Sequence, residues 1–310
     1  MLHGGESALP MLCDLLKDEN ATVRWQAVKS ICRLGPMAKR ALPDLIQAMG
    51  GMDSTVRSWA AEALVRMGDE PAVLPALMQL LEHDDVGVRI DTARTLWRLT
   101  NRADIAVPPL IHVLHRPHGE RRWEALAVLA EIGPPAEAAL PEIEKATGDE
   151  LVLVRIVAAN ALWKVTQQAS VAVRVLADAL KDDAWSLRCD AARGLGQIGP
   201  AAHAAAGALS KALDDTEPFV RLYAAEALWN IKRQADQVLP VLLAFLKSEK
   251  YWYRSRAAEL LGRMGKAAAP AIPALLAPMG DPKEEVRKAA SVAQGSISAE
   301  DALEGVGKQP

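Results

Sequence analysis

The sequence contains no apolar run that approaches the roughly 18 residues needed to span a bilayer. Its first residues lack the basic and apolar regions of a secretory signal peptide. Only three cysteines are present, and none belongs to a CxxC pair, which argues against a disulfide framework and for a reducing compartment. We therefore predict a cytoplasmic protein without a membrane-spanning segment.

An excess of charge of either sign is also missing. Lys and Arg number 36 against 39 Asp and Glu, which gives a net charge of −3. This balance provides no global attraction for nucleic acid or for an anionic membrane, although it is compatible with a local basic patch. Phe and Tyr are scarce, with two and three residues, whereas Trp occurs eight times. The aromatic chemistry of this sequence is therefore carried mainly by indole rings.

One arginine position recurs at a nearly constant interval along the whole chain. A small residue follows this arginine after three positions, and aliphatic residues usually follow after seven and ten. Offsets −1, +3, +7 and +10 fall on one face of an α-helix. The series therefore predicts the second helix of a two-helix repeat. Its members are Arg24, Arg57, Arg89, Arg122, Arg155, Arg188, Arg221, Arg254 and Arg287.

The ends of both helices carry signals as well. Asn20, Asp53 and Asp85 stand four residues before the arginine, where an N-cap is expected. A glycine eleven residues after the arginine marks the helix end in five copies, at Gly35, Gly68, Gly133, Gly199 and Gly265. A proline in the first turn marks the start of the first helix, at Pro10, Pro43, Pro75, Pro108, Pro141, Pro240 and Pro273. No segment alternates with period two, so the chain is predicted to be all-α.

Residues 188–199, with the sequence RCDAARGLGQIG, are close to the consensus second helix of one group of HEAT repeats. Over roughly residues 8–298 the chain resembles the HEAT-repeat superfamily, most closely a bacterial subgroup named after phycobilisome lyase subunits. The resemblance implies a right-handed superhelix with the first helices on the convex side and the second helices on the concave side. Each repeat would then stack only on its neighbours.

We therefore predict a right-handed α-solenoid of nine HEAT-like repeats, forming a single domain over residues 1–298 and followed by a flexible tail over 299–310. The last repeat loses its apolar register, as a terminal cap does. The first helix lacks such a cap, which predicts either a further covering segment of a longer chain or self-association there. The expected repeats are 8–35, 36–68, 69–100, 101–133, 134–166, 167–199, 200–232, 233–265 and 266–298.

A finer period, two repeats long, is visible from the third repeat on. Large and small residues alternate eight positions after the arginine, in the order Trp97, Ala130, Trp163, Gly196, Trp229 and Gly262. Each large ring is expected to lie across the gap that a neighbouring small residue leaves. Trp163 and Trp229 are therefore interpreted either as packing residues or as partner contacts.

Aromatic and basic residues on the predicted concave face form the candidate binding surface, because Trp and Arg dominate interface hot spots. The candidates are Trp25, Trp59, Trp97, Trp123, Lys29, Arg33, Arg66, Arg94 and Arg98. Ile90 and Leu222 are expected on the same face. Only Glu62 and Asp91 oppose the basic residues of the first three repeats, which predicts a basic groove. The repeated arginine itself is interpreted as structural, pairing with Asp residues of the preceding loops (Asp53, Asp85, Asp183, Asp215, Asp281).

Two sequence motifs suggest a ligand site, but the residues around them argue against it. Residues 194–199 match GxGxxG, but they close a helix instead of opening one, so no dinucleotide is expected there. His112, His115 and His118 have an HxxHxxH spacing, but Pro117 separates the third from the others and no Cys or carboxylate set accompanies them. We therefore predict no cofactor and no metal.

The leading hypothesis is a protein that is not an enzyme: a scaffold holding a protein or peptide in the concave groove. A bilin lyase-type or lyase-chaperone activity is one alternative, implied by the name of the resembling subgroup. A nucleic-acid binder similar to the HEAT-like alkylpurine glycosylases is another, although the regular repeats and balanced charge disfavour it. The HEAT-type deoxyhypusine hydroxylases are disfavoured because the chain has no paired His-Glu ligands.

Overall fold

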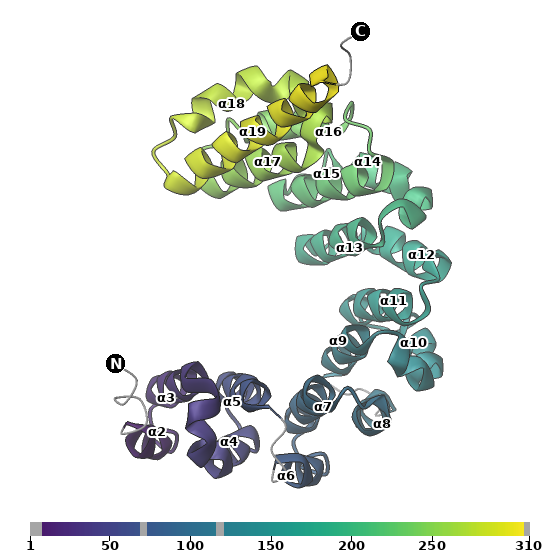
Figure 1. The fold of residues 1–310 in the computed structure, drawn as a ribbon. Coiled ribbons are helices and arrows are strands. Elements are labelled where there is room, and N and C mark those ends of the chain that lie inside the picture. Colours follow the sequence, from purple (N-terminus) through teal and green to yellow (C-terminus); the bar gives the residue numbers. More distant parts are fainter. Residues whose placement is uncertain (1–7, 69–72, 116–120, 307–310) are drawn as a thin grey trace. The chain divides into compact units, whose positions relative to one another are not determined.

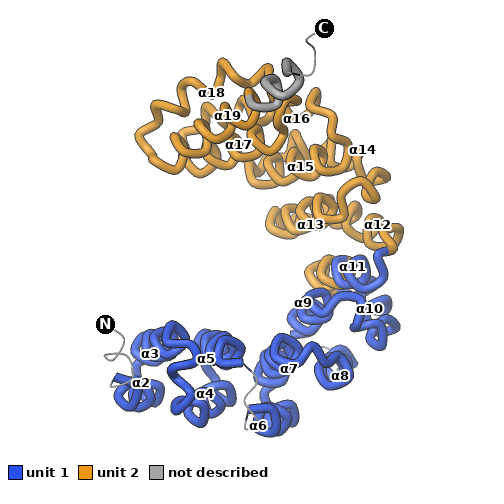
Figure 2. Tube along the Cα trace, in the orientation of Figure 1, with its two compact units in different colours: residues 1–150, 160–167 blue, residues 151–159, 168–310 orange. Residues whose placement is uncertain are grey.

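The structure is a computed structural model that describes residues 8–68, 73–115 and 121–306, with side chains described as far as residue 298. Throughout these residues the chain forms α-helices and short 3-10 helices and no strand (Figure 1). Two compact units are distinguished (Figure 2): unit 1 comprises Met1–Glu150 and Asn160–Gln167, and unit 2 comprises Leu151–Ala159 and Gln168–Pro310. The predicted all-α solenoid is confirmed.

First and second helices alternate along the described chain. The first helices are α2 (Leu9–Leu15), α4 (Leu42–Met49), α6 (Val73–Leu80), α8 (Ala103–Leu114), α10 (Leu140–Ala146), α12 (Ala169–Ala179), α14 (Ala206–Ala212), α16 (Val238–Phe245) and α18 (Ile272–Met279). The second helices are α3 (Ala21–Leu34), α5 (Ser54–Met67), α7 (Val86–Thr100), α9 (Arg122–Ile132), α11 (Val152–Thr166), α13 (Trp185–Ile198), α15 (Pro218–Lys232), α17 (Tyr251–Met264) and α19 (Glu284–Val306). The last of these continues beyond residue 298, where a tail was expected.

The predicted N-caps of α3, α5 and α7 are confirmed. The side chain of Asn20 accepts a hydrogen bond from the backbone N–H of Thr22 at 2.9 Å. Asp53 caps α5 by accepting from two backbone N–H groups, and Asp85 caps α7 by accepting from the N–H of Val88 at 3.0 Å. Each cap satisfies an N–H group that has no partner within its helix.

The period of two repeats corresponds to two alternating kinds of helix end. Where the second helix ends in glycine, that glycine has a positive φ, and a 3-10 helix begins at or follows Gly35, Gly133, Gly199 and Gly265. These are η1 (Gly35–Ala41), η2 (Pro134–Ala139), η3 (Gly199–Ala205) and η4 (Gly265–Ala271). The intervening helices α7, α11 and α15 are one residue longer at their C-terminal ends. The residues that follow them are Asn101, Gln167 and Arg233. Each of these residues has a φ between 52° and 58°, so a single left-handed residue replaces the glycine turn.

Successive second helices in unit 2 approach each other closely at Gly196 and Gly262, the small residues that alternate with tryptophan eight positions after the repeated arginine. A Cβ built on Gly196 would lie 3.1 Å from the Cα of Ala227, and one built on Gly262 would lie 3.0 Å from the Cα of Ala293. The surface above these glycines is therefore occupied by the next second helix itself. That a tryptophan ring also lies across this gap stays a prediction. Trp229 is buried, with the guanidinium of Arg233 5.3 Å from its ring centroid.

The side-by-side packing of second helices also corrects the predicted open face. Ile90 and Leu222, one residue after the repeated arginine, are buried instead of facing the groove. An inner second helix is covered by its first helices and by the second helices on either side, so only a narrow stripe stays accessible. That stripe carries the residues two, five and nine positions after the repeated arginine. Examples are Trp59 and Lys29, which are half-buried, and Arg33, which is exposed.

Candidate functional site

The repeated arginines connect adjacent repeats. Arg188 donates two hydrogen bonds of 2.8 Å from Nε and Nη2 to the carboxylate of Asp215, and Arg254 pairs in the same bidentate way with Asp281. Three further pairs of this series are Arg24–Asp53, Arg57–Asp91 and Arg122–Asp149. The carboxylate thus comes from the following repeat, and Asp53, Asp215 and Asp281 are among the aspartates that were expected to pair with the repeated arginine.

The preceding loop contributes backbone carbonyl groups instead. The Nη1 of Arg188 donates to the carbonyl oxygens of Asp182 and Asp183 at 2.8 and 2.9 Å. Arg188 therefore ties its own loop to the carboxylate of the next loop, and Arg254 does the same. Arg188 in turn lowers the pKa of Asp215 by hydrogen bonding to its carboxylate. These contacts give the arginines a structural part in stacking, and Arg89, Arg221 and Arg287 make the loop contacts as well.

Three of the predicted binding residues meet at one end of unit 1. The Nζ of Lys29 lies 4.8 Å from the ring centroid of Trp25 and 5.5 Å from that of Trp59, so a single ammonium group contacts both indoles. Both rings are half-buried and pack against the core of the first repeats. Trp97 is also half-buried, whereas Trp123 is exposed. These tryptophans serve packing at least as much as they form an open surface.

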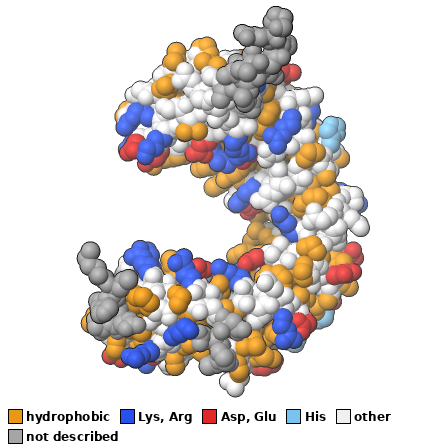
Figure 3. Space-filling view, in the orientation of Figure 1, with side chains coloured by type: hydrophobic (Ala, Val, Ile, Leu, Met, Phe, Trp, Pro, Cys, Tyr) orange, Lys and Arg blue, Asp and Glu red, His pale blue; other side chains and the backbone are white. Residues whose placement is uncertain are grey.

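The predicted basic groove of the first repeats is largely neutralised. Glu62 accepts hydrogen bonds of 2.9 Å from both Arg66 and Arg98, and these arginines lower its pKa. Arg94 pairs with Asp91 at 3.6 Å and with Glu131 at 3.3 Å. Basic side chains do gather along the edge of unit 1 formed by α3, α5 and α7, but acidic side chains are interspersed among them (Figure 3). Acidic residues therefore pair with three of the five basic residues of the predicted groove, namely Arg66, Arg94 and Arg98.

A second aromatic surface, which the sequence analysis missed, lies in unit 2. We call it the aromatic strip; it consists of Trp185, Phe219, Phe245, Tyr251, Trp252 and Tyr253. The rings of Trp185 and Phe219 stack with centroids 5.9 Å apart and an interplanar angle of 18°. Tyr253 lies 5.0 Å from Phe219 and 5.3 Å from Phe245, measured between centroids. The rings therefore form one continuous series.

Four members of the aromatic strip are open to solvent. The exposed fractions are 47 % for Trp185, 43 % for Trp252, and 36 % for both Phe219 and Tyr251. Apolar side chains of this size rarely gather at a surface without a partner. Tyr253 and Phe245 are buried beneath them and anchor the series.

The first turns of α13, α15 and α17 place these rings at one end of the second helices. Trp185, Phe219 and Tyr253 precede the repeated arginine by three, two and one residues. Consecutive rings are therefore separated by nearly one repeat length, so stacking of the repeats brings them together. That spacing is the signal in the sequence from which the strip could have been predicted.

Basic groups and a pocket adjoin the aromatic strip. Arg221, Lys250 and Lys283 lie 5.4–5.6 Å from the centroids of Phe245, Trp252 and Tyr251. An open pocket of about 460 Å³ lies between α14, α15 and α16. Its walls are formed by Leu213, Pro218, Arg221, Pro240, Val241, Ala244, Phe245, Ser248 and Tyr253. The site thus offers planar rings, cationic groups and a largely apolar cavity.

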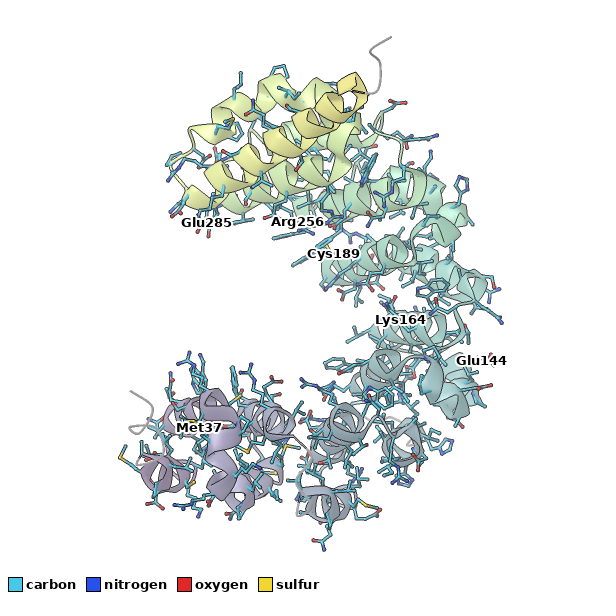
Figure 4. All side chains as sticks on the ribbon, in the orientation of Figure 1. Met37, Glu144, Lys164, Cys189, Arg256 and Glu285 are labelled. Atoms are coloured by element: carbon cyan, nitrogen blue, oxygen red, sulfur yellow. The ribbon has the colours of Figure 1, made fainter. Side chains whose placement is uncertain are left out.

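Another edge of unit 2 carries a cluster of ion pairs. Glu226 of α15 accepts hydrogen bonds from Arg256 and Arg263 of α17, at 2.9–3.0 Å and 2.7 Å. Figure 4 shows Arg256 at this edge, together with Glu285 of α19. Because every one of these three groups is paired, the cluster ties α15 to α17 and offers no free charge to a ligand.

The described residues offer neither an activated thiol nor a cluster of metal ligands. Burial raises the pKa of Cys13 and of Cys189 to about 11, so both thiols stay protonated at neutral pH. No group of three or more His, Cys, Asp or Glu side chains suitable for a metal occurs in the described part of the chain. His115 pairs with Glu142 at 2.9 Å, and His118 lies outside the described residues. No described helix is long and apolar enough to cross a membrane.

Comparisons with known proteins show which proteins this chain is similar to. The family described as HEAT repeats matches residues 9–97, 107–188, 143–229, 173–262 and 239–306. A phycocyanobilin lyase subunit alpha from Picosynechococcus sp. (strain ATCC 27264 / PCC 7002 / PR-6) is 31 % identical over 179 residues, covering 55 % of this chain. The chain spans 57 % of the length of that relative.

A solved structure is also similar: the complex of CpcE and CpcF of phycocyanin lyase from Nostoc sp. PCC7120, with 26 % identity and a TM-score of 0.48. The match covers 76 % of this chain and 92 % of that one. The similarity to a lyase subunit contradicts the predicted non-catalytic scaffold and the prediction that the protein is not an enzyme. It favours the bilin lyase-type alternative instead.

Proposed function

Because the chain belongs to the HEAT-repeat family, whose fold by itself specifies no chemistry, we propose its function from the site and from the lyase relative together. The chain acts as a lyase-type subunit that binds phycocyanobilin, or a bilin of the same kind, on the aromatic strip of unit 2. The observation that carries this proposal is the continuous series of Trp185, Phe219 and Tyr253, in which the stacked rings of Trp185 and Phe219 are exposed to solvent.

The chemistry of the pigment matches the chemistry of the strip. A bilin is an open chain of four pyrrole-type rings with an extended conjugated system and propionic acid side chains. The exposed rings of Trp185, Phe219 and Trp252 provide flat apolar area for the conjugated rings. Lys250 and Lys283 lie at the edge of the strip, where they are placed to attract the carboxylates.

The part of this chain in the reaction is to bind and orient the pigment. A lyase makes or breaks a bond at a carbon–carbon or carbon–heteroatom double bond, and the described residues of this chain offer no activated thiol for such a step. The buried thiols of this chain have raised pKa values, so they do not compete for the pigment. Holding the bilin on a fixed surface supplies proximity and orientation for its transfer.

The proposal is tested by titrating phycocyanobilin with the protein and recording the absorption spectrum. Binding to a rigid aromatic surface is expected to shift and sharpen the long-wavelength band. The double variant Trp185→Ala/Phe219→Ala is expected to weaken binding at least tenfold, because it removes two stacking surfaces worth about 1 kcal/mol each. The matched control is Trp25→Ala/Trp59→Ala, which removes two aromatic rings from unit 1 and is expected to bind normally. An unchanged pigment spectrum with the wild-type protein would contradict the proposal.

A further inference from the structure

The arginine–aspartate pairs that connect the repeats are interrupted at one position. From the fourth repeat on, the residue 27 positions after the repeated arginine is Asp149, Asp182, Asp215, Ser248 and Asp281. Serine is therefore the exception, and it stands at the position that pairs with Arg221. The substitution removes a carboxylate from a place where the repeat architecture otherwise supplies one.

The flanking repeats show what that carboxylate does. Asp215 and Asp281 each accept two hydrogen bonds from an arginine and one from the backbone N–H two residues later, at 2.9 Å. Ser248 keeps only the second of these functions, since its Oγ accepts from the N–H of Lys250 at 3.3 Å. The neutral hydroxyl group of Ser248 cannot form an ion pair with the guanidinium of Arg221.

Arg221 consequently uses only part of its guanidinium. Its Nη1 donates to the carbonyl oxygens of Asp215 and Thr216 at 2.6 and 3.0 Å. No carboxylate of the described residues forms an ion pair with it; Glu217, four residues earlier, also makes none. Arg188 and Arg254 use Nε and Nη2 for their aspartates, and the same two donors of Arg221 have no such acceptor.

The surroundings of Arg221 are those of a ligand pocket. Its guanidinium carbon lies 5.6 Å from the ring centroid of Phe245 and lines the pocket of about 460 Å³, together with Ser248 and Tyr253. The remaining walls are mainly apolar, which strengthens a charge pair formed inside. The pocket also joins the aromatic strip, because Phe245 and Tyr253 belong to both.

We propose that this pocket binds a carboxylate of the ligand, which takes the place of the missing aspartate and accepts the bidentate pair from Arg221. The inference rests on the proposed function, since the carboxylate is a propionate of the bilin lying on the aromatic strip. The rings fix the conjugated system, and Arg221 fixes the direction in which the pigment lies. Arg221 is thus a specificity residue for a pigment with a free acid.

The decisive variant is Ser248→Asp, which restores the carboxylate of the other repeats. It is expected to fold and to melt no lower than the wild type, because aspartate occupies the equivalent position at Asp215 and Asp281 and pairs there with the repeated arginine. Ser210→Asp is the matched control: it adds the same charge to unit 2 on α14, outside the residues that line the pocket.

The probes are phycocyanobilin and its dimethyl ester, in which both propionates are blocked. The wild type and Ser210→Asp are expected to bind the free acid about ten- to a hundredfold more tightly than the ester, the range of one charge-assisted pair. Ser248→Asp is expected to lose this preference, because its own carboxylate takes the two free donors of Arg221. Full retention of the preference in Ser248→Asp, or an equal affinity of the wild type for acid and ester, would overturn the carboxylate pocket alone. Failure of the wild type to bind either pigment would overturn the proposed function and the pocket with it.

Discussion

The close approach of the second helices makes a quantitative prediction for one glycine. In Gly262→Ala the new Cβ would lie 3.0 Å from the Cα and 3.3 Å from the Cβ of Ala293. Because the nearest atom belongs to the backbone, α17 and α19 must move apart. Such overpacking costs about 1–3 kcal/mol, whereas alanine in place of glycine gains about 1 kcal/mol of helix propensity. The net effect is a loss of roughly 0–2 kcal/mol in the free energy of unfolding.

Gly295 provides the matched control because it occupies the same repeat position in α19. A Cβ built there meets nothing within 4 Å, so Gly295→Ala is expected to stabilise the protein by about 1 kcal/mol. The two variants should therefore differ by roughly 1–3 kcal/mol in urea unfolding followed by circular dichroism. Equal effects of the two substitutions would refute the argument that close helix approach requires the glycine.

Two further predictions concern charge and thiol chemistry. Arg188 holds the pKa of Asp215 below its ordinary range, so the stability that this carboxylate contributes is complete above about pH 4 and is lost as the pH falls through the lowered value. Asp215→Asn should accordingly cost roughly 1–3 kcal/mol at pH 7 and flatten the acid limb of the stability curve; an unchanged acid limb would contradict the pairing. Because burial raises the pKa of Cys13 and Cys189 to about 11, a thiol reagent at pH 8 should modify both slowly in the native protein and rapidly in urea. Rapid native modification of Cys189 would show that its helix opens readily.

The repeat itself was predictable because its signals are local. The arginine series, the caps at Asn20, Asp53 and Asp85, and the terminal glycines each act within one or two turns of a helix. The period of two repeats was also visible in the sequence. The structure relates it to two kinds of helix end and to glycines that admit the neighbouring helix.

The accessible surface was harder to predict because it depends on neighbours that lie a full repeat away in the sequence. Glu62 neutralises Arg98, which is 36 residues later, and no local pattern announces that pair. Burial of Ile90 likewise results from packing between second helices. The aromatic strip was missed for the same reason: Trp185 and Phe219 meet only after the repeats have stacked.

Hydrogen–deuterium exchange in the presence and absence of phycocyanobilin tests the central claim most directly, because it locates the bound pigment. The account predicts added protection in the first turns of α13, α15 and α17 and in α16, where the aromatic strip and its pocket lie. Peptides from α3 and α5, which carry Trp25 and Trp59, should exchange as before. Protection confined to α3 and α5, or no protection at saturating pigment, would contradict the assignment of the aromatic strip as the bilin site.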